Sequence, residues 1–299
     1  MWLFFGFASA LFLGLYEINK KISLTNNAVI PVLFLNTVFC SLLFLPALLL
    51  SRFAPETIQG SVFYVANIDP GTHCYIILKS LIVLISWGSA YVAIKHLPIT
   101  IYAPIKSLQP ALVLLGALLV FGERLNFCQF AGILVALVCF YLYSLAGKME
   151  GISFWKNKWV WCLFLAMATG AVSGLYDKFL MHRFDRMAVQ VWYTIYQIFM
   201  MLPILLIVWY PKRKQSSPFH FRWSIIGISF FLCLSDFLYF YALSIPQSMI
   251  SVVSVVRRSD ILVSFIAGAL FFHDKNIKTK ALILIGVILG MVLLSLGTI

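Results

Sequence analysis

Long apolar runs separated by short polar connectors extend along the whole sequence. A helix needs about 20 mostly apolar residues to cross the hydrocarbon core of a bilayer. The longest connector, from Arg52 to Cys74, has room for a short interfacial segment but not for a soluble domain. On this basis ten transmembrane helices are predicted, at residues 2–18, 29–50, 75–94, 98–121, 127–146, 159–180, 189–210, 223–243, 247–272 and 279–298.

Composition supports a membrane protein. Hydrophobic residues make up 62% of the chain and charged residues only 11%, whereas a soluble domain carries about 25% charged residues. The formal net charge of +12 is compatible with nucleic-acid binding in a soluble protein. Here, however, Lys and Arg fall mostly in the connectors between apolar runs, which is the pattern of membrane topology. We therefore expect the lipid bilayer, and no nucleic acid, as a partner.

The two halves of the chain contain an internal repeat. Three short segments of the first half return in the same order in the second, and the last two pairs have the same separation. The pairs are GLYE (14–17) and GLYD (174–177), FGER (121–124) and FHDK (272–275), and LYSL (142–145) and LLSL (293–296).

This repeat predicts an inverted topology. Each half contains five predicted helices, an odd number, so the second half must enter the membrane from the opposite side. Proteins of this kind place their substrate near the midplane, where the repeats meet. We expect an all-α polytopic membrane protein of ten transmembrane helices, in which residues 1–147 and 159–299 form two inverted-topology five-helix repeats.

Two arginines and an aspartate lie deep inside the predicted ninth span. At about 1.5 Å per residue, Arg257 is about 16 Å along the helix from Pro246, close to the middle of a hydrocarbon core of roughly 30 Å. A charge at that depth costs about 2.5–3.5 kcal/mol on insertion scales. Such a residue normally faces a cavity or a charged partner, so Arg257, Arg258 and Asp260 are candidate site residues.

The repeat gives Arg257 a counterpart in the fourth span. At the separation shared by the last two repeat pairs, Arg257 corresponds to Lys106. Inverted symmetry would present these two cations to one cavity from opposite halves. Tyr102, Lys106 and Gln109 are spaced i, i+4, i+7 and share one helix face. A comparable polar face is predicted on the ninth span, formed by Ser248, Ser251, Ser254 and Arg258.

The chain resembles a known group of transporters. Ten spans, paired halves and an acidic residue after the fourth and ninth spans, Glu123 and Asp274, resemble the EamA-type members of the drug/metabolite transporter superfamily. The resemblance covers essentially the whole chain and implies an all-helical secondary carrier with a central cavity. It does not name a substrate, because members move amino acids, drugs, sugars, nucleotide sugars or phosphorylated metabolites.

The charge pattern is also similar to the plastidic phosphate translocators of the same superfamily. Those proteins grip phosphate with a lysine in an I-K-x-L-E-P context on the fourth span and a Lys-Arg pair on the ninth. The segments IKSLQP and VVRRSDI of this chain resemble the two contexts. The resemblance implies anion recognition by Lys106, Arg257 and Arg258. Gln109 in place of the glutamate, and the added Asp260, depart from the pattern and put a full phosphate site in doubt.

A purely structural alternative exists for the charges of the ninth span. Arg257 and Asp260 are spaced i, i+3, so they are close enough to pair on a helix and lock neighbouring helices together. We favour the functional interpretation, because three cations against one nearby anion leave charge that something must neutralise.

Three further carboxylates are candidates for coupling or gating. Glu17 and Asp177 are repeat mates near the ends of predicted spans, where they could form interfacial ion pairs or lids, or serve as a gate or a proton-coupling site. Asp236 lies deeper and could be either a counter-ion for the arginines or a proton site.

The preferred function is a secondary transporter that moves a small organic metabolite, with an anion favoured, by alternating access. The alternative is a proton-coupled exporter of amino acids or amphipathic drugs. An intramembrane enzyme, a scramblase or a channel is less favoured. No nucleophile, acid–base pair or metal cluster is visible, so no catalytic residue, metal or cofactor is expected. We expect a monomer or homodimer in the inner membrane of a bacterium. The Lys and Arg distribution places both termini outside the cytoplasm, whereas many relatives are thought to have them inside.

Overall fold

The computed structural model describes residues 2–106, 109, 111–113, 115–116, 126–148, 156–213, 218–245, 253, 256–272 and 276–296. All regular secondary structure in these ranges is helical. The helices are α1 (Trp2–Leu24), α2 (Val29–Phe53), α3 (Pro55–Ile58), α4 (Pro70–His96), α5 (Ile99–Lys106), α7 (Phe127–Lys148), α8 (Lys158–Arg183), α9 (Arg186–Ile204), the π-helix η1 (Leu205–Trp209), α10 (Ser224–Ser244), α12 (Asp260–Leu270) and α13 (Ile277–Leu296).

Five helices in the described part of the chain are long and apolar enough to cross a membrane. They are Val29–Phe53, Pro70–His96, Lys158–Met181, Arg186–Trp209 and Ser224–Ser244. The helices α1, α7 and α13 occupy three further predicted spans. The described residues therefore support an all-helical membrane protein, and the number of ten transmembrane helices remains a prediction.

The α4 helix begins five residues before the predicted span. Pro70 occupies its first turn, where a missing N–H costs nothing, and the Asp69 side chain accepts a hydrogen bond from the Thr72 backbone N–H at 3.1 Å. The Thr72 hydroxyl also donates to Asp69, and these bonds hold the pKa of the exposed Asp69 carboxyl below its usual range. This cap moves the start of the helix outward and leaves Lys79 more than two turns inside it.

The α1 helix is also longer than predicted, because it continues through its charged residues to Leu24. Lys20, which the sequence places in a connector, is fully buried, and Glu17 is buried beside it. Glu17 therefore lies inside the protein, where it forms an ion pair with Lys20. The polar residues of this helix end find partners inside the protein, so the helix does not need to stop where the apolar run stops.

Helices from the two halves of the chain interleave. The most extensive helix pairs are α1–α10, α7–α13, α4–α8 and α2–α9, followed among others by α5–α12. In repeat order α8 is the counterpart of α1, and α10 is the counterpart of α4, so the α1–α10 and α4–α8 pairs are equivalent. The other three pairs each join a helix to its own counterpart. A two-fold operator generates this reciprocal pattern, as expected for inverted repeats.

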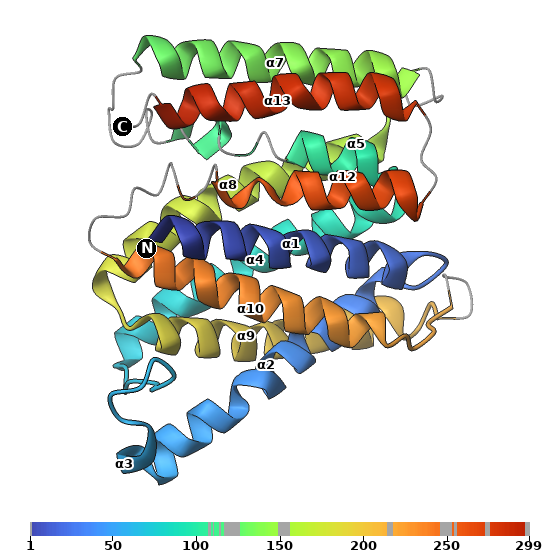
Figure 1. Cartoon of the computed structure of the whole chain (residues 1–299). Coiled ribbons are helices and arrows are strands. Elements are labelled where there is room, and N and C mark those ends of the chain that lie inside the picture. Colours follow the sequence, from blue (N-terminus) through green and yellow to red (C-terminus); the bar gives the residue numbers. More distant parts are fainter. Residues whose placement is uncertain are drawn as a thin grey trace.

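Figure 1 shows the resulting arrangement, with α7 and α13 side by side along one edge and α2 diverging toward α3 at the opposite edge. The start of α1 and the end of α13 lie toward the same end of the molecule.

Small polar residues join α1 to α10 across the two halves. The Ser9 hydroxyl donates to the Ser235 carbonyl at 2.8 Å, and the Ser235 hydroxyl donates to the Ser9 carbonyl at 2.9 Å. Ser23 and Ser224 form a further bond at 2.6 Å toward the other end of the pair. Such residues allow close approach of helix backbones and add hydrogen bonds where lipid provides no hydrophobic drive for association.

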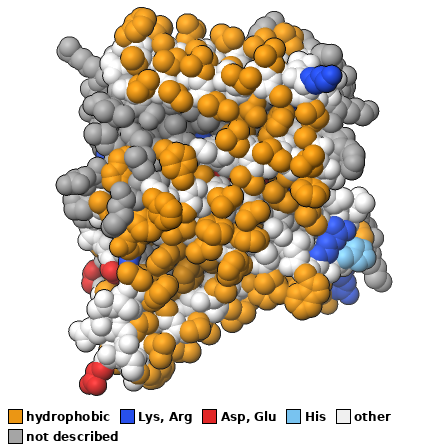
Figure 2. Space-filling model, viewed as in Figure 1, with side chains coloured by type: hydrophobic (Ala, Val, Ile, Leu, Met, Phe, Trp, Pro, Cys, Tyr) orange, Lys and Arg blue, Asp and Glu red, His pale blue; other side chains and the backbone are white. Residues whose placement is uncertain are grey.

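The outer surface is apolar. Figure 2 shows hydrophobic side chains over most of one face, with the visible charged side chains mainly toward its edges. Phe4, Phe130 and Leu282 are 70%, 59% and 71% exposed. A soluble monomer rarely exposes apolar patches larger than a few hundred Å², so this surface is suited to lipid.

Candidate functional site

A cavity of about 130 Å³ lies between the two halves, lined by residues of α1, α4, α5, α8, α9 and α10 together with residues that follow α5 or precede α12. One water molecule needs about 10–15 Å³ of such space, so the cavity has room for several waters or a small metabolite. Its described wall carries four cations and two carboxylates, namely Lys79, Lys106, Arg257, Arg258, Asp177 and Asp236. Lys106 and Arg257, predicted to face a shared cavity, both lie on this wall.

Lys106 reaches the cavity from the end of α5 and forms an ion pair with Glu17 of α1. The same carboxylate also pairs with Lys20, whose Nζ lies 2.5 Å from Oε2. The Glu17 side chain is 1% exposed and that of Lys106 is 17% exposed. Glu17 therefore lies behind the cavity wall and holds two lysines, of which only Lys106 is in contact with the cavity.

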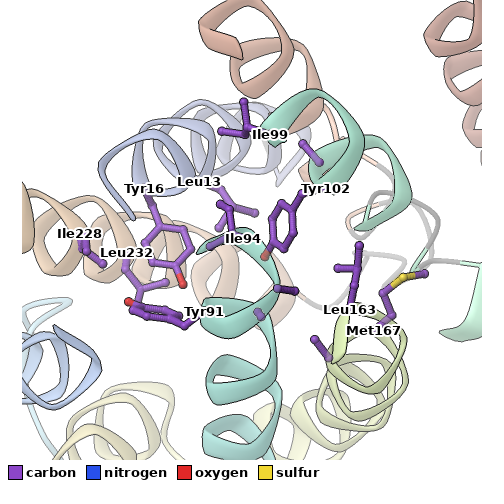
Figure 3. Packing of buried hydrophobic residues seen from close by; sticks show 14 of the residues in the cluster. Leu13, Tyr16, Tyr91, Ile94, Ile99, Tyr102, Leu163, Met167, Ile228 and Leu232 are labelled. Carbon is purple, nitrogen blue, oxygen red and sulfur yellow. The ribbon is translucent and has the colours of Figure 1, made fainter. Parts of the chain in front are cut away.

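Tyrosine side chains surround the buried ammonium of Lys20. It donates to the hydroxyls of Tyr16 at 3.4 Å and Tyr102 at 3.3 Å. The rings of Tyr16, Tyr91 and Tyr102 lie within cation–π distance, at 4.4, 5.3 and 5.4 Å. Figure 3 shows these three tyrosines in one buried cluster contributed by α1, α4 and α5.

Tyr102, predicted as a substrate-binding residue, is therefore placed in this cluster. It is fully buried, and it does not line the cavity with Lys106 and Gln109. Its hydroxyl instead helps to hold Lys20, a residue that the sequence analysis did not propose for the site.

Arg257 pairs with Asp236 of α10. Its guanidinium also donates to the Ser235 hydroxyl at 3.3 Å and lies 4.1 Å from the centroid of the Tyr239 ring. The Tyr193 hydroxyl donates to the other oxygen of Asp236 at 2.9 Å. Of the two roles left open for Asp236, this geometry provides that of a counter-ion for an arginine.

The structural alternative, in which Arg257 pairs with Asp260, is wrong. No ion pair joins these two described residues, and the Arg257 guanidinium pairs with Asp236 instead. The ninth span is not one regular helix at this point. Arg258 and Ser259 form a turn, and α12 begins at Asp260. The Ile261 N–H donates to the Arg258 carbonyl, three residues earlier, at 3.2 Å, which marks a tight turn at this point of the chain.

Lys79 of α4 pairs with Asp177 of α8 and connects the first half of the chain to the second. Its ammonium also lies over the rings of Tyr193 and Phe240, at 4.9 and 5.1 Å. Like Glu17, Asp177 is buried and forms its ion pair inside the protein.

The sequence analysis missed Lys79. The predicted third span began at 75, so Lys79 lay near its end, where a lysine can extend its ammonium to the interface. One signal was present: LKSL (78–81) resembles the IKSL (105–108) that contains Lys106.

The remaining predicted residues divide between the wall and the protein interior. Arg258 and Gln109 line the cavity. Asp260 is 5% exposed and lies in the first turn of α12, where the helix dipole favours a carboxylate. Among the residues that the structure describes, no carboxylate forms an ion pair with Arg258. Ser248, Ser251, Ser254, Glu123 and Asp274 lie outside the described residues.

No group of three His, Cys, Asp or Glu residues that could hold a metal ion occurs within the described ranges. The described cavity wall offers paired charges, hydroxyls, an amide and aromatic rings.

Comparisons with known proteins agree with this architecture. A crystal structure described only as "Crystal structure of protein" has the same fold, with a TM-score of 0.64 and 14% sequence identity, over 99% of this chain and 97% of that chain. A search of curated proteins found no match. The EamA-like transporter family matches residues 1–145 and 157–296. Since the two matched segments cover nearly the whole chain, the protein belongs to the EamA-like transporter family and is an integral membrane protein.

Proposed function

We propose that the protein is a secondary carrier that moves a small organic anion across the membrane by alternating access. The observation that carries this proposal is the excess of positive charge on the described cavity wall, where four cations face two carboxylates. Including the buried layer behind the wall, Lys20, Glu17 and Asp260, the count is five cations to four carboxylates.

An excess cation inside a membrane protein is costly unless something neutralises it. Arg258 is the best candidate for the unneutralised charge, because it lines the cavity and is in no ion pair with a described carboxylate. A planar guanidinium can bind a carboxylate or phosphate through two parallel hydrogen bonds. An anionic group on the substrate would thus complete the charge balance of the site.

Lys106 would supply the second contact to the anion by exchanging partners. Its ammonium is bound to Glu17 in this conformation, but Glu17 is also held by Lys20. When Lys106 turns to the substrate, Glu17 keeps one buried counter-ion. The free energy cost of releasing Lys106 is therefore lower than the cost of leaving a buried carboxylate alone.

The interleaved repeats provide the framework for alternating access. Carriers built from inverted repeats expose a midplane site to each side in turn by rocking one bundle against the other. The Lys79–Asp177 pair links the two halves beside the cavity, so a relative movement of the halves would act on it directly.

A second candidate is a proton-coupled exporter of amino acids or amphipathic drugs. The observation in its favour is that Glu17, Asp177, Asp236 and Asp260 are all buried, with exposures of 1%, 7%, 8% and 5%. Buried carboxylates in membrane proteins often serve as proton relays. A transport rate driven by a pH gradient, with neutral or cationic substrates, distinguishes this function from anion exchange.

The test is a thermal-shift screen of the purified protein with inorganic phosphate, small phosphate esters, carboxylates and matched neutral and cationic compounds. Counter-exchange in proteoliposomes follows for the compounds that stabilise it. We expect anions to stabilise the wild-type protein and to exchange. Arg258→Gln should lower the exchange rate at least about tenfold, equivalent to about 1.4 kcal/mol.

Arg213→Gln is the matched control, because Arg213 is exposed and does not line the cavity. It should exchange anions as the wild type does. Stabilisation by neutral or cationic compounds alone, or equal exchange by the two variants, would contradict an anion carrier.

A further inference from the structure

The repeat mates Gly14 and Gly174 occupy equivalent positions in the GLYE and GLYD segments, inside α1 and α8 respectively. Glycine in a helix interior lowers helix stability relative to alanine. A glycine inside a helix therefore needs a steric or functional explanation, and the explanation differs between Gly14 and Gly174.

Close packing accounts for Gly14. A Cβ atom placed on Gly14 would lie 2.5 Å from Cβ and 2.8 Å from Cγ1 of Val263. Real Cβ atoms essentially never come so close to other atoms. The missing side chain allows α1 to approach the ninth span, where α12 lies.

Packing does not account for Gly174. A Cβ atom at this position would meet nothing within 4 Å, although Gly174 lies in the middle of a continuous helix. The residue lines the central cavity together with Ser173 and Asp177 of the same helix. The space that its missing side chain leaves open is therefore cavity space.

The charges around the cavity indicate what this space can hold. Asp177 follows Gly174 by one helical turn and disfavours a second negative charge there, while Lys106 and Arg258 provide positive charge from other elements of the wall. Ser173 and Gln109 offer a hydroxyl and an amide to a neutral polar group. An organic anion would thus place its charged group near Arg258 and its uncharged body against α8.

We propose that Gly174 is a specificity-determining residue, whose missing side chain leaves room in the cavity for the uncharged polar body of an organic anion. The inference rests on the proposed anion-carrier function and deepens it. It proposes as substrates organic anions that are larger than a simple inorganic ion and have an uncharged polar body, as polyol phosphates and sugar phosphates do.

The first test compares Gly174→Leu with Gly88→Leu. Gly88 is a matched control, because it also lies inside a helix with nothing within 4 Å of its Cβ position, but it does not line the cavity. Proteoliposomes are assayed for exchange of inorganic phosphate, glycerol phosphate and a hexose phosphate.

We expect Gly174→Leu to lose exchange of the two larger anions by more than about tenfold while phosphate exchange changes less than about threefold, and Gly174→Ala to be intermediate. Gly88→Leu should behave as the wild type. The proposal would be overturned if Gly174→Leu exchanged the larger anions and phosphate at the same ratio of rates as the wild-type protein. Thermal melting of each variant shows whether a loss reflects unfolding.

The second test separates failure of this inference from failure of the anion-carrier proposal. Gly174→Cys and Gly88→Cys are made in a background whose native cysteines are replaced, and both react in membranes with a small anionic methanethiosulfonate and with a bulky one. Gly174→Cys should react with the small reagent at least about tenfold faster than Gly88→Cys does. Gly174→Cys should also react more slowly with the bulky reagent than with the small one.

This result would place Gly174 on an anion-accessible wall whether or not any tested anion is carried. An unreactive Gly174→Cys would overturn the assignment of Gly174 to the cavity wall. The anion-carrier proposal would then be judged from the exchange rate of Arg258→Gln. A reactive Gly174→Cys combined with the absence of anion exchange would overturn the carrier proposal and, with it, the assignment of an organic-anion substrate.

Discussion

Glu17 holds two buried lysines with one carboxylate, and this sharing determines how readily Lys106 can bind a substrate. Lys20 has no contact with the cavity and is surrounded by tyrosines. A buried charge left without a partner is strongly destabilising, by about 3–5 kcal/mol. Lys20 therefore acts through Glu17, as a positioning residue that retains the carboxylate when Lys106 turns to the anion.

Replacement of Lys20 by methionine should raise the KM for anion exchange by about tenfold, equivalent to about 1.4 kcal/mol, because Glu17 would then depend on Lys106 alone. Lys20→Arg should keep a KM near the wild-type value. In the double variant Glu17→Gln, Lys20→Met, Lys106 is no longer held by a carboxylate and the KM should fall again. Kinetics in proteoliposomes measure these values. A double variant no better than Lys20→Met would contradict the role of Lys20.

At the scale of helices, the break in the ninth span and the serine contacts between α1 and α10 position the arginines. The turn at Arg258 and Ser259 removes Arg257 from the regular helix that contains Asp260. Arg257 then reaches Ser235 and Asp236 of α10. The same Ser235 also exchanges hydrogen bonds with Ser9, so a contact between helices and a contact within the site share one residue.

Ser9→Ala and Ser235→Ala should separate these two roles. Interhelical hydrogen bonds in membrane proteins contribute about 0.6 kcal/mol on average, so each substitution should lower stability by about 1 kcal/mol. Only Ser235→Ala also removes a contact to Arg257, and we expect it alone to weaken anion exchange, by a few-fold. Ser244→Ala is the control, since its hydroxyl is exposed and donates to the nearby Tyr241 carbonyl. Equal exchange by the Ser9 and Ser235 variants would argue against this division.

On the scale of the whole molecule, the helices of the two halves interleave, and both halves contribute residues to the cavity wall. Of the ion pairs in the described residues, Glu17 with its two lysines lies within the first half, and Arg257–Asp236 lies within the second. Lys79–Asp177 connects the halves. This pair therefore stabilises the conformation described here relative to any conformation in which the halves have moved apart at that point.

A double-mutant cycle on Lys79→Met and Asp177→Asn should show strong coupling. Each single substitution leaves one buried charge unpaired and should cost about 3–5 kcal/mol, whereas the double variant should lose clearly less than the sum. Lys178→Met, a substitution of an exposed lysine on α8, should change stability by less than about 0.5 kcal/mol. Thermal unfolding in detergent measures these effects. Additive losses would show that the two residues do not act as a pair.

Much of the architecture follows from local properties of the chain. A run of about 20 apolar residues predicts a membrane helix wherever it occurs, and the repeated GLYE and GLYD segments indicate paired halves without any knowledge of packing. The membership of the EamA-like transporter family and the all-helical character follow from such features. The helix ends were less predictable, because caps such as Asp69 and buried partners such as those of Lys20 lie outside the hydropathy pattern.

By itself, then, the sequence determined that the chain is a helical membrane protein with an internal repeat and with charges at depth. Only the tertiary structure decided the partners of those charges. Lys79 and Asp177 are separated by 98 residues in the chain, and Lys106 and Glu17 by 89, so their pairing depends on how distant helices pack. The contrast between Gly14 and Gly174 has the same origin. Equivalent residues in the two halves have different roles because one meets a neighbouring helix and the other meets the cavity.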